Sequence, residues 1–510
     1  MKPIFTLLLV GLSSLSLFSQ TTEDALLFSQ ERLSGSARFI GMGGAFGSLG
    51  GDLSALKVNP AGSAIFLHNY ATFTLSSETY TNDATFIDNL ENRRNNSFNI
   101  EQAGAVFVFN NTNEAATINK LAFGITYDML NGLNRRYNAQ GENSTSIASY
   151  FEGLANGVPL DYFTPRNGES LQDLYIYLGE TRFDNLNISN SELQSAYLGY
   201  EAFLFDANDP NNLDNTAYTS NVTGSSFDQF YSHSSRGYNG KLSFNGSIQL
   251  YEKLNVGVNL NLHTLYYERT TGFDEIIGNQ SEINNIYFQN SLSSVGIGFS
   301  TQVGAIANLN DYVRVGATYH SPTWYSISDE TTQFLYTYSN EFGEVYADPN
   351  VINVYPNYRL KNPGKVTGSL GLVFKQFGLI SFDYSYKDYS NTRLSATEGT
   401  YDYDAQNQAM ETLFTSASTY RLGGEYRYNK WSFRAGYRME ESPYENKDLM
   451  SDLNGYSGGI GYDFGEIKLD AAYDYSSQDF QTFASDSGIS QPIQIENERH
   501  NIILSLSFDF

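Results

Sequence analysis

The last ten residues of the chain, 501–510, alternate between apolar and polar side chains. The apolar positions are Ile502, Leu504, Leu506, Phe508 and Phe510. The positions between them are Asn501, Ile503, Ser505, Ser507 and Asp509. Successive side chains of a β-strand point to opposite faces, so this strand has one apolar and one mainly polar face. A transmembrane β-barrel shows this pattern, with the apolar face toward lipid and the polar face toward the lumen.

The same alternation recurs along the chain and predicts about fourteen strands. They lie near 68–80, 98–109, 119–131, 229–250, 254–270, 290–307, 311–325, 360–375, 377–391, 416–429, 431–441, 453–464, 466–478 and 498–510. Most connections after even-numbered strands are short, as at 251–253, whereas those after odd-numbered strands are long and polar. Short turns at one end and long loops at the other are typical of outer-membrane barrels. We therefore predict an all-β transmembrane fold, an antiparallel outer-membrane β-barrel over 68–510 with a periplasmic C-terminus.

The longest predicted loop, 132–228, is an insertion on the extracellular side. It contains two stretches with helical character, 146–155 and 191–205, and it is rich in Asn and Asp. We expect an extracellular cap rather than a separate domain.

The N-terminus has the features of a secretory signal peptide. A charged start at Lys2 is followed by an apolar run that ends at Phe18 and by the small residue Ser19. This run is shorter than the roughly 20 residues of a spanning helix. We predict a signal peptide over 1–19. Because the chain has 0 Cys, neither a lipid anchor nor a disulfide framework is available.

Residues 20–67 are rich in glycine and small residues and lack the alternation. Their apolar content is higher than that of a solvated linker. We therefore predict that they form an N-terminal hatch, or plug, inside the barrel lumen.

Composition limits the classes of function. Aromatic residues make up 15% and charged residues 17% of the chain, and the mean hydropathy is −0.37. A soluble secreted β-protein is the plainest alternative, but so many tyrosines suit membrane interfaces. The net charge of −26 argues against a nucleic-acid partner, since phosphate binding requires clustered Lys and Arg. The negative charge serves either the solubility of the loops or contacts with lipopolysaccharide and divalent cations.

A set of short motifs resembles the FadL/TodX family of outer-membrane proteins that transport hydrophobic compounds. The predicted hatch carries the family's spaced glycines, arginine, acidic residue and Asn-Pro pair, here Gly35, Arg38, Gly41, Asp52, Asn59 and Pro60. The resemblance continues at 316–322, at 362–364 and through much of 420–462. The insertion resembles nothing familiar.

This resemblance implies a fourteen-stranded barrel closed by the hatch, with passive uptake of small hydrophobic molecules such as long-chain fatty acids or aromatic hydrocarbons. It also implies a side opening in the wall and gating by the hatch. We predict that the apolar hatch residues Phe28, Phe39, Met42 and Phe46 line the ligand pocket. The expected partners are outer-membrane lipid, lipopolysaccharide and the barrel assembly machinery, which would read the terminal strand. Family members also act as scaffolds or shuttles in protein-secretion assemblies, which is the alternative function.

Other chemistry receives little support from the sequence. The stretch 41–44 does not fit a dinucleotide-binding loop, because Phe46 stands at the third glycine position. The five His residues show no metal-ligand spacing, and Ser is too common to indicate a catalytic triad. We expect no cofactor, no metal and no enzymatic activity. Four arginines share a face with Glu425, either as an ion-pair ladder or as a docking site for a carboxylate headgroup: Arg421, Arg427, Arg434 and Arg438.

Overall fold

The computed structural model describes residues 21–510 apart from 114–115, 182, 184–185, 187, 279–280, 398–401 and 485–488. The predicted signal peptide lies outside these residues. Among the described residues, no helix is long and apolar enough to cross a membrane.

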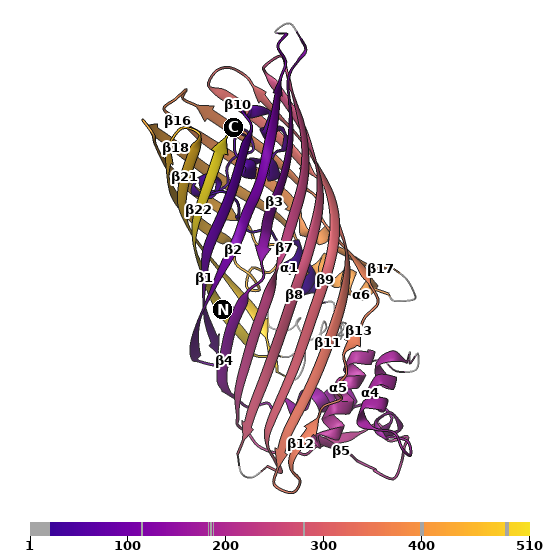
Figure 1. The fold of residues 1–510 in the computed structure, drawn as a ribbon. Coiled ribbons are helices and arrows are strands. Elements are labelled where there is room, and N and C mark those ends of the chain that lie inside the picture. The colour runs from indigo at the N-terminus through magenta and orange to yellow at the C-terminus, as the bar shows by residue number, and fades with distance from the viewer. Residues whose placement is uncertain are drawn as a thin grey trace, which may run out of the picture.

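An antiparallel sheet closes on itself to form the wall of the molecule (Figure 1). The first strand, β1 (Tyr70–Phe86), pairs with the last, β22 (Pro492–Asp509), and this pairing closes the barrel. The strands between them are β2 (Asn89–Asn110), β3 (Ile118–Gly132), β7 (Phe227–Leu250), β8 (Leu254–Ile277), β9 (Ile283–Asn308), β10 (Val313–His320), β11 (Thr323–Ser339), β14 (Tyr358–Asn362), β15 (Lys365–Val373), β16 (Gly378–Asp388), β18 (Ser416–Tyr428), β19 (Trp431–Glu440), β20 (Leu453–Asp463) and β21 (Ile467–Phe483).

Two wall strands are each interrupted once. β10 and β11 follow one another across Ser321 and Pro322, and both pair with β9. β14 and β15 follow one another across Pro363 and Gly364, and they pair with β11 and β10 respectively. With each pair taken as one strand, the barrel has fourteen strands, which confirms the predicted number.

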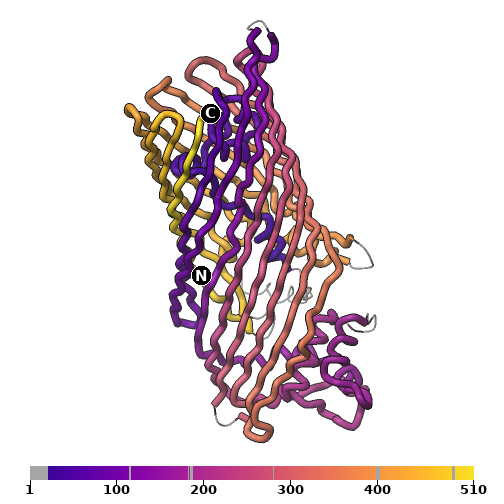
Figure 2. Tube along the Cα trace, in the orientation of Figure 1, coloured from indigo at the N-terminus to yellow at the C-terminus, as the bar shows by residue number. Residues whose placement is uncertain are grey.

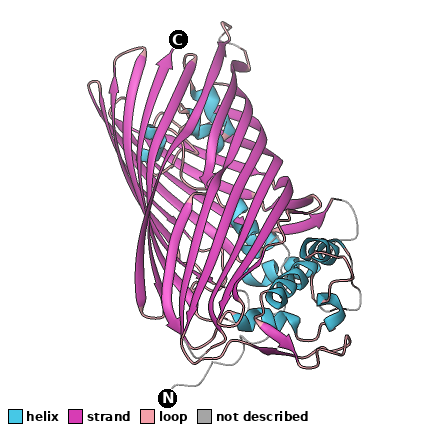
Figure 3. Ribbon diagram, turned by 60° about the horizontal axis from the view of Figure 1, so that its bottom comes forward, coloured by secondary structure: helices cyan, strands magenta, loops and turns pink. Residues whose placement is uncertain are grey.

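Shorter elements extend the wall and cap its long-loop end. These are β4 (Arg135–Asn143), β5 (Phe205–Ala207), β6 (Tyr218–Ser220), β12 (Gly343–Ala347), β13 (Asn353–Val354), β17 (Arg393–Ala396), α3 (Ala148–Ala155), η3 (Leu160–Phe163), α4 (Leu171–Glu180), α5 (Asn190–Glu201), η4 (Tyr389–Asn391) and α6 (Asp404–Leu413). The helices α3, α4 and α5 gather at the end of the barrel opposite the C-terminus (Figure 3). Two of these helices match the predicted helical stretches, and α4 was not predicted.

Several wall strands are much longer than the sequence pattern predicts. Residues 81–97 were expected to form a long loop, but β1 and β2 continue through them and meet at a tight turn, Ile87–Asp88. Likewise β8 and β9 run on into the expected loop 271–289. These extensions lie beyond the apolar outer belt, so their outward face needs no lipid-facing residues and the pattern of the membrane-spanning part does not continue into them.

The chemical pattern of the wall reverses along each long strand. On β8, outward side chains are apolar from Leu254 to Leu262, and the inward ones include Asn259 and His263. Beyond this point Thr264 and Thr270 face outward, and the inward side chains include the nearly fully buried Leu265, Tyr267, Phe273 and Ile277 beside the polar Arg269 and Glu275. β22 reverses in the same way. The nine-residue outer belt matches a membrane-spanning strand. The part of the strand above this belt, meaning on the side of the helical cap, encloses an apolar lumen.

The hatch fills the polar half of the lumen. It comprises α1 (Thr22–Ser29), α2 (Ala37–Gly41), η1 (Leu53–Lys57) and η2 (Pro60–Ile65). Figure 2 shows this segment in indigo inside the barrel, extending from the middle toward the end with the C-terminus. Wall glycines allow its backbone to approach closely. A methyl group at Gly257 would lie 2.6 Å from the Ala61 nitrogen, and one at Gly436 would lie 2.7 Å from the Gly43 Cα.

Buried apolar side chains of the described residues form four separate clusters, and three of them surround the cap, α1 and the middle of the hatch. One joins the helical cap to the barrel mouth, with Phe151, Tyr197 and Phe273 among its members. A second surrounds α1 at mid-height and includes Leu265, Tyr325 and Ile327. The third lies within the hatch and against the wall, where Ile503 is fully buried, and this explains why an apolar residue stands on the polar face of the last strand.

Candidate ligand-binding site

The polar residues of the hatch motif attach the hatch to the wall and hold its own turns. Arg38 Nε donates to Glu425 Oε2 over 2.9 Å, and Arg38 Nη1 donates to the Gly51 carbonyl over 2.9 Å. Asp52 accepts from Ser36 Oγ and caps η1 through Ser54 N. Asn59 Nδ2 donates to the Gly47 carbonyl (2.7 Å) and to the Ala305 carbonyl of β9 (3.0 Å).

The remaining motif residues shape the hatch backbone. Gly35 has φ +122°, a conformation that L-residues rarely adopt, and a side chain there would also overlap Ser54. Gly41 lies against Gly459 of β20. Pro60 occupies the first position of η2, where its missing N–H costs nothing. These residues position the hatch.

The luminal arginines form an ion-pair ladder. Arg434 pairs with Glu425 (2.7 Å) and with Asp470 (2.5 Å), and Arg427 also pairs with Glu425 (2.5 Å). Further along the wall, Arg438 pairs with Asp474. Carboxylates occupy the guanidinium groups of Arg427, Arg434 and Arg438, so the ladder interpretation is favoured for these three. Arg421 lies 3.9 Å from Glu440, and its Nε is buried without a partner.

The four predicted pocket residues separate into two groups. Phe28 belongs to the mid-height cluster and lines a cavity beneath α1. Phe39, Met42 and Phe46 are fully buried in the hatch cluster, where the rings of Phe39 and Phe46 lie 5.3 Å apart. The structure therefore does not bring these three together with Phe28.

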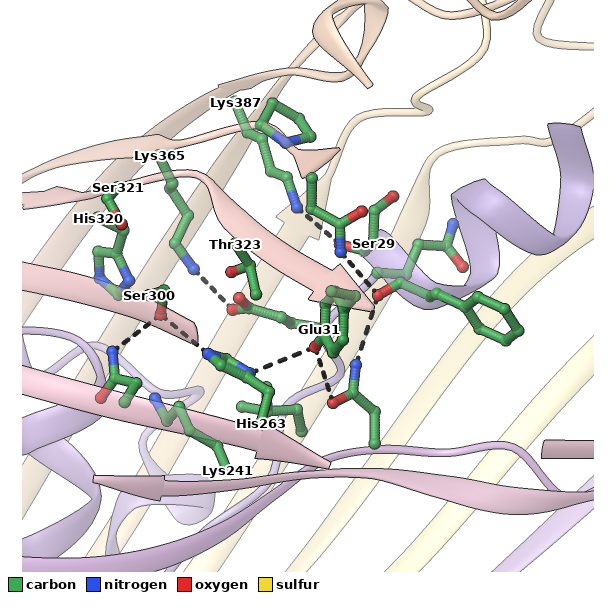
Figure 4. Close-up of a pocket in the computed structure, with 18 residues that line it drawn as sticks. Ser29, Glu31, Lys241, His263, Ser300, His320, Ser321, Thr323, Lys365 and Lys387 are labelled. Carbon is green, nitrogen blue, oxygen red and sulfur yellow. Dashed lines mark hydrogen bonds and ion pairs between the residues drawn. The ribbon is translucent and has the colours of Figure 1, made fainter. Parts of the chain in front are cut away.

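The cavity beneath Phe28 is rich in basic side chains (Figure 4). It is a small cavity of about 30 Å³ between the end of α1 and the wall. Three lysines and two histidines line it from β7, β8, β10, β15 and β16: Lys241, His263, His320, Lys365 and Lys387. The one carboxylate among the lining residues is that of Glu31, whose Oε2 lies 2.7 Å from Lys365 Nζ.

A hydrogen-bond network fixes one wall of this cavity. His263 Nε2 lies 2.8 Å from Ser300 Oγ, and its Nδ1 lies 3.3 Å from the Tyr325 hydroxyl. Tyr325 in turn donates to Asn239 Oδ1 over 3.1 Å. The end of α1 is held from the other side, because Lys387 Nζ donates to the Ser29 carbonyl over 2.6 Å.

Two buried polar groups lining the cavity remain unsatisfied, the side-chain oxygens of Asn261 and Asn362. Lys241 is only 4% exposed and lies opposite Asp128 of β3 in the strand register. Buried polar groups in folded proteins are nearly always hydrogen-bonded, so the two amide oxygens indicate a place for a ligand or for water.

The cavity lies where both interrupted strands break. Ser321 and Pro363 line it, and neither Pro322 nor Pro363 has an N–H to continue the ladder. Sequence analysis did not identify the residues that line the cavity as a site. Their clustering depends on strand register and on the position of α1. A usable signal was the presence of lysine at luminal positions that otherwise carry Ser and Asn.

A second cavity on the far side of α1 is more aromatic. It is lined by Leu26, Leu27, Tyr137, Tyr267, Tyr444 and Phe480, together with Arg135 and Arg269. Arg269 is paired with Asp24 of α1 (2.8 Å). A third cavity shares Gln30 with this one and Glu31 with the basic one. The end of α1 thus lies between an aromatic and a basic compartment.

The hydrogen-bonded ladder between β2 and β3 is interrupted part of the way along the wall. Their ladder runs from Asn110 to Gln102, and over the described residues β2 pairs only with β1 beyond that point. There β3 turns inward, since its Leu130 carbonyl accepts from Arg32 N of the hatch (2.9 Å). β4 then lies against both β1 and β2, and Asn82 Nδ2 of β1 donates to the Arg136 carbonyl of β4 (2.9 Å).

The chain shares its fold with solved outer-membrane channels. It matches a crystal structure of a Pseudomonas aeruginosa FadL homologue at 12% identity and a TM-score of 0.59, covering 94% of this chain and 100% of the other. It also matches the P. putida toluene transporter TodX at 15% identity and a TM-score of 0.53, covering 94% and 99%. No curated protein sequence matches the chain.

The family model of outer membrane transport proteins of the OMPP1/FadL/TodX type matches residues 202–510. This range contains more than half of the chain, including the strands that carry the basic cavity. The chain therefore belongs to the OMPP1/FadL/TodX family of outer membrane transport proteins.

Proposed function

We propose that this barrel takes up small hydrophobic molecules across the outer membrane by passive diffusion, and that long-chain molecules with an anionic headgroup are its preferred ligands. The observation that carries the proposal is the reversal of polarity along the wall. Above the membrane belt the apolar side chains turn inward, so the barrel encloses an apolar lumen where an aqueous pore would have polar walls.

The apolar lumen provides the driving force for binding. Leu265, Tyr267 and Ile327 face inward in the mid-height cluster around α1. Removing an alkyl chain from water contributes about 0.8 kcal/mol per buried CH₂ group. We call the lumen lined by this cluster the apolar tier. A long-chain molecule binds more tightly because of it, whereas a small polar solute does not.

The basic cavity supports the preference for an anion. It adjoins the apolar cluster, because Phe28 and Tyr325 belong to both. Lys241 supplies a buried ammonium, and a ligand carboxylate would pair with it. A neutral aromatic hydrocarbon would occupy the apolar tier without using this cavity.

The break between β2 and β3 supports a lateral exit. The free energy of a hydrophobic solute is lower if it leaves the lumen sideways into the membrane than if it passes through the hatch-filled, polar end. Tyr80, Asn131 and Arg135 border the third cavity close to this break. We propose that the solute passes there, and that the short-turn end with the C-terminus faces the periplasm.

Uptake by whole cells tests this function. Gram-negative cells without a hydrophobic channel of their own should take up labelled oleate and labelled toluene faster when they express this chain. Lys241→Met keeps the side-chain volume and should lower oleate uptake about tenfold while leaving toluene uptake unchanged. Lys253→Met, on an exposed turn, is the matched control and should change neither.

Two outcomes would oppose the proposal. If the barrel assembles fully and neither compound enters faster than in cells with an empty vector, the chain is not an uptake channel. If removal of residues 144–226 abolishes capture of a secreted protein without affecting uptake, the scaffold function is favoured for the cap.

A further inference from the structure

Glu31 occupies an unusual position at the end of the first hatch helix. It lines the basic cavity, the third cavity and a further cavity formed with Arg421 and Glu440. Its side chain is 43% accessible, because it projects into the luminal space between these cavities. Figure 4 shows it in the centre of the basic cluster, with Lys365 and Lys387 on one side and His263 and Lys241 on the other.

The surroundings strongly favour the ionised form of Glu31. Burial within the barrel opposes ionisation, but Lys365, Lys387, His320 and Lys241 together hold the pKa of Glu31 well below its usual range. Its carboxylate nevertheless makes one short ion pair, with Lys365. The Glu31 carboxylate is thus held mainly by the electrostatic field of the surrounding lysines rather than by an enclosing set of hydrogen bonds.

The neighbouring attachments of the hatch differ from this one. Arg32, the next residue, is only 8% accessible and pairs with Glu101 (2.9 Å) and with Glu78 (2.5 Å) of the wall. Arg38 is held by Glu425. Glu31 can therefore leave Lys365 without releasing the rest of the hatch, and only the short connection after α1 would have to move.

We propose that Glu31 is an internal substitute for the ligand's headgroup, resting in the lysine cluster of the empty channel until an anionic ligand displaces it. This inference rests on the proposed function and specifies how the same site is regulated. A carboxylate that enters from the apolar tier pairs with Lys241 and Lys365. Repulsion between the two carboxylates then drives Glu31 away from Lys365.

Two consequences follow from this exchange. The affinity for anionic ligands is lowered by the competing carboxylate, which permits release, because an uncontested three-lysine site would hold its ligand tightly. Displacement of Glu31 also alters the junction between the basic cavity and the cavity beside the wall break. Binding of an anion, and not of a neutral molecule, would therefore loosen the segment 29–31.

Ligand titration of the purified full chain tests the proposal with oleate and with the neutral long-chain alcohol oleyl alcohol. Glu31→Gln removes the charge at nearly constant shape and should tighten oleate binding at least tenfold without changing the affinity for the alcohol. Glu31→Asp keeps the charge and should stay within about threefold of the unaltered chain. Glu23→Gln, on the same hatch helix, is the control and should change neither affinity.

Hydrogen exchange of residues 29–33 provides a second measurement that does not depend on affinity. Exchange should accelerate when oleate is added to the unaltered chain and should already be fast in Glu31→Gln. If Glu31→Gln binds oleate no more tightly, or weakens both ligands equally, Glu31 has only a structural role and the inference is wrong. If the unaltered chain binds neither ligand, the proposed function itself fails.

Discussion

At the scale of single residues, the face of the strand to which a side chain points determines its exposure more than its hydrophobicity does. Leu260 and Leu265 lie on the same strand, yet Leu260 faces outward and is 49% exposed, whereas Leu265 faces the lumen and is 2% exposed. They are five positions apart, and because this spacing is odd, the period of two places them on opposite faces. The sequence contains this information, because the apolar positions of β8 change from even to odd numbers after Leu262.

The position of the membrane belt gives a test at this scale. Leu260→Arg places a charge against hydrocarbon and should lower the free energy of unfolding by about 2–4 kcal/mol. Thr270→Arg is the matched control on the same face of the same strand, above the belt, and should change it by less than about 0.5 kcal/mol. Denaturant unfolding in lipid vesicles measures both. Equal losses would mean that the reversal of pattern does not mark the membrane boundary.

Other residue-level features could not be predicted from the sequence. The basic cavity combines Lys241, Lys365 and Lys387 with Glu31, which are up to 356 positions apart in the chain. The alternation indicates that a lysine faces the lumen, but it does not give the height at which each lysine lies. That height depends on the register between strands and on the breaks at 321–322 and 363–364.

At the scale of elements, the hatch is held by close backbone contacts as well as by ion pairs. Gly41 of the hatch lies directly against Gly459 of β20, so the two backbones approach closely there. The wall carries its own glycines for the same purpose, at Gly257 and Gly436. These could not be distinguished from other strand glycines by sequence, because only the folded hatch shows which ones it covers.

A single methyl group tests this contact. Gly257→Ala would overlap the Pro60 carbonyl and should push η2 off the wall, so that purified barrels in planar bilayers show bursts of ion current. Gly246→Ala, on the adjacent strand β7, adds its methyl group to open space and should leave the barrel closed. If both variants stay closed, the hatch tolerates displacement here and the seal lies elsewhere.

At the scale of the whole molecule, the two ends of the barrel differ in construction. Turns such as 251–253 and 429–430 close one end, and the helices α3 to α5 with long strand extensions form the other. Sequence analysis predicted the number of strands and the short turns. It was wrong about the length of the strands beyond the membrane, because there the apolar positions move to the inward face and the alternation changes phase within one strand.

Cysteine labelling of intact cells tests the proposed orientation. The chain has no native cysteine, so single substitutions give a clean background. Cysteines at Glu252 and Lys430 should be shielded from an impermeant maleimide, and cysteines at Asn190 and Asn407 should react. Both sets lie outside the membrane belt, so shielding reports the side of the membrane. The opposite labelling would invert the proposed orientation.

The central claim is that hydrophobic ligands travel inside the barrel and not along its lipid-facing surface. Photo-crosslinking with a diazirine-bearing fatty acid, mapped by mass spectrometry, separates these two locations because inward and outward residues alternate. The account predicts crosslinks on the inward-facing side chains Phe28, Leu265 and Tyr325 that excess oleate abolishes. Crosslinks confined to the outward-facing Leu260, Leu262 and Phe299 would contradict it.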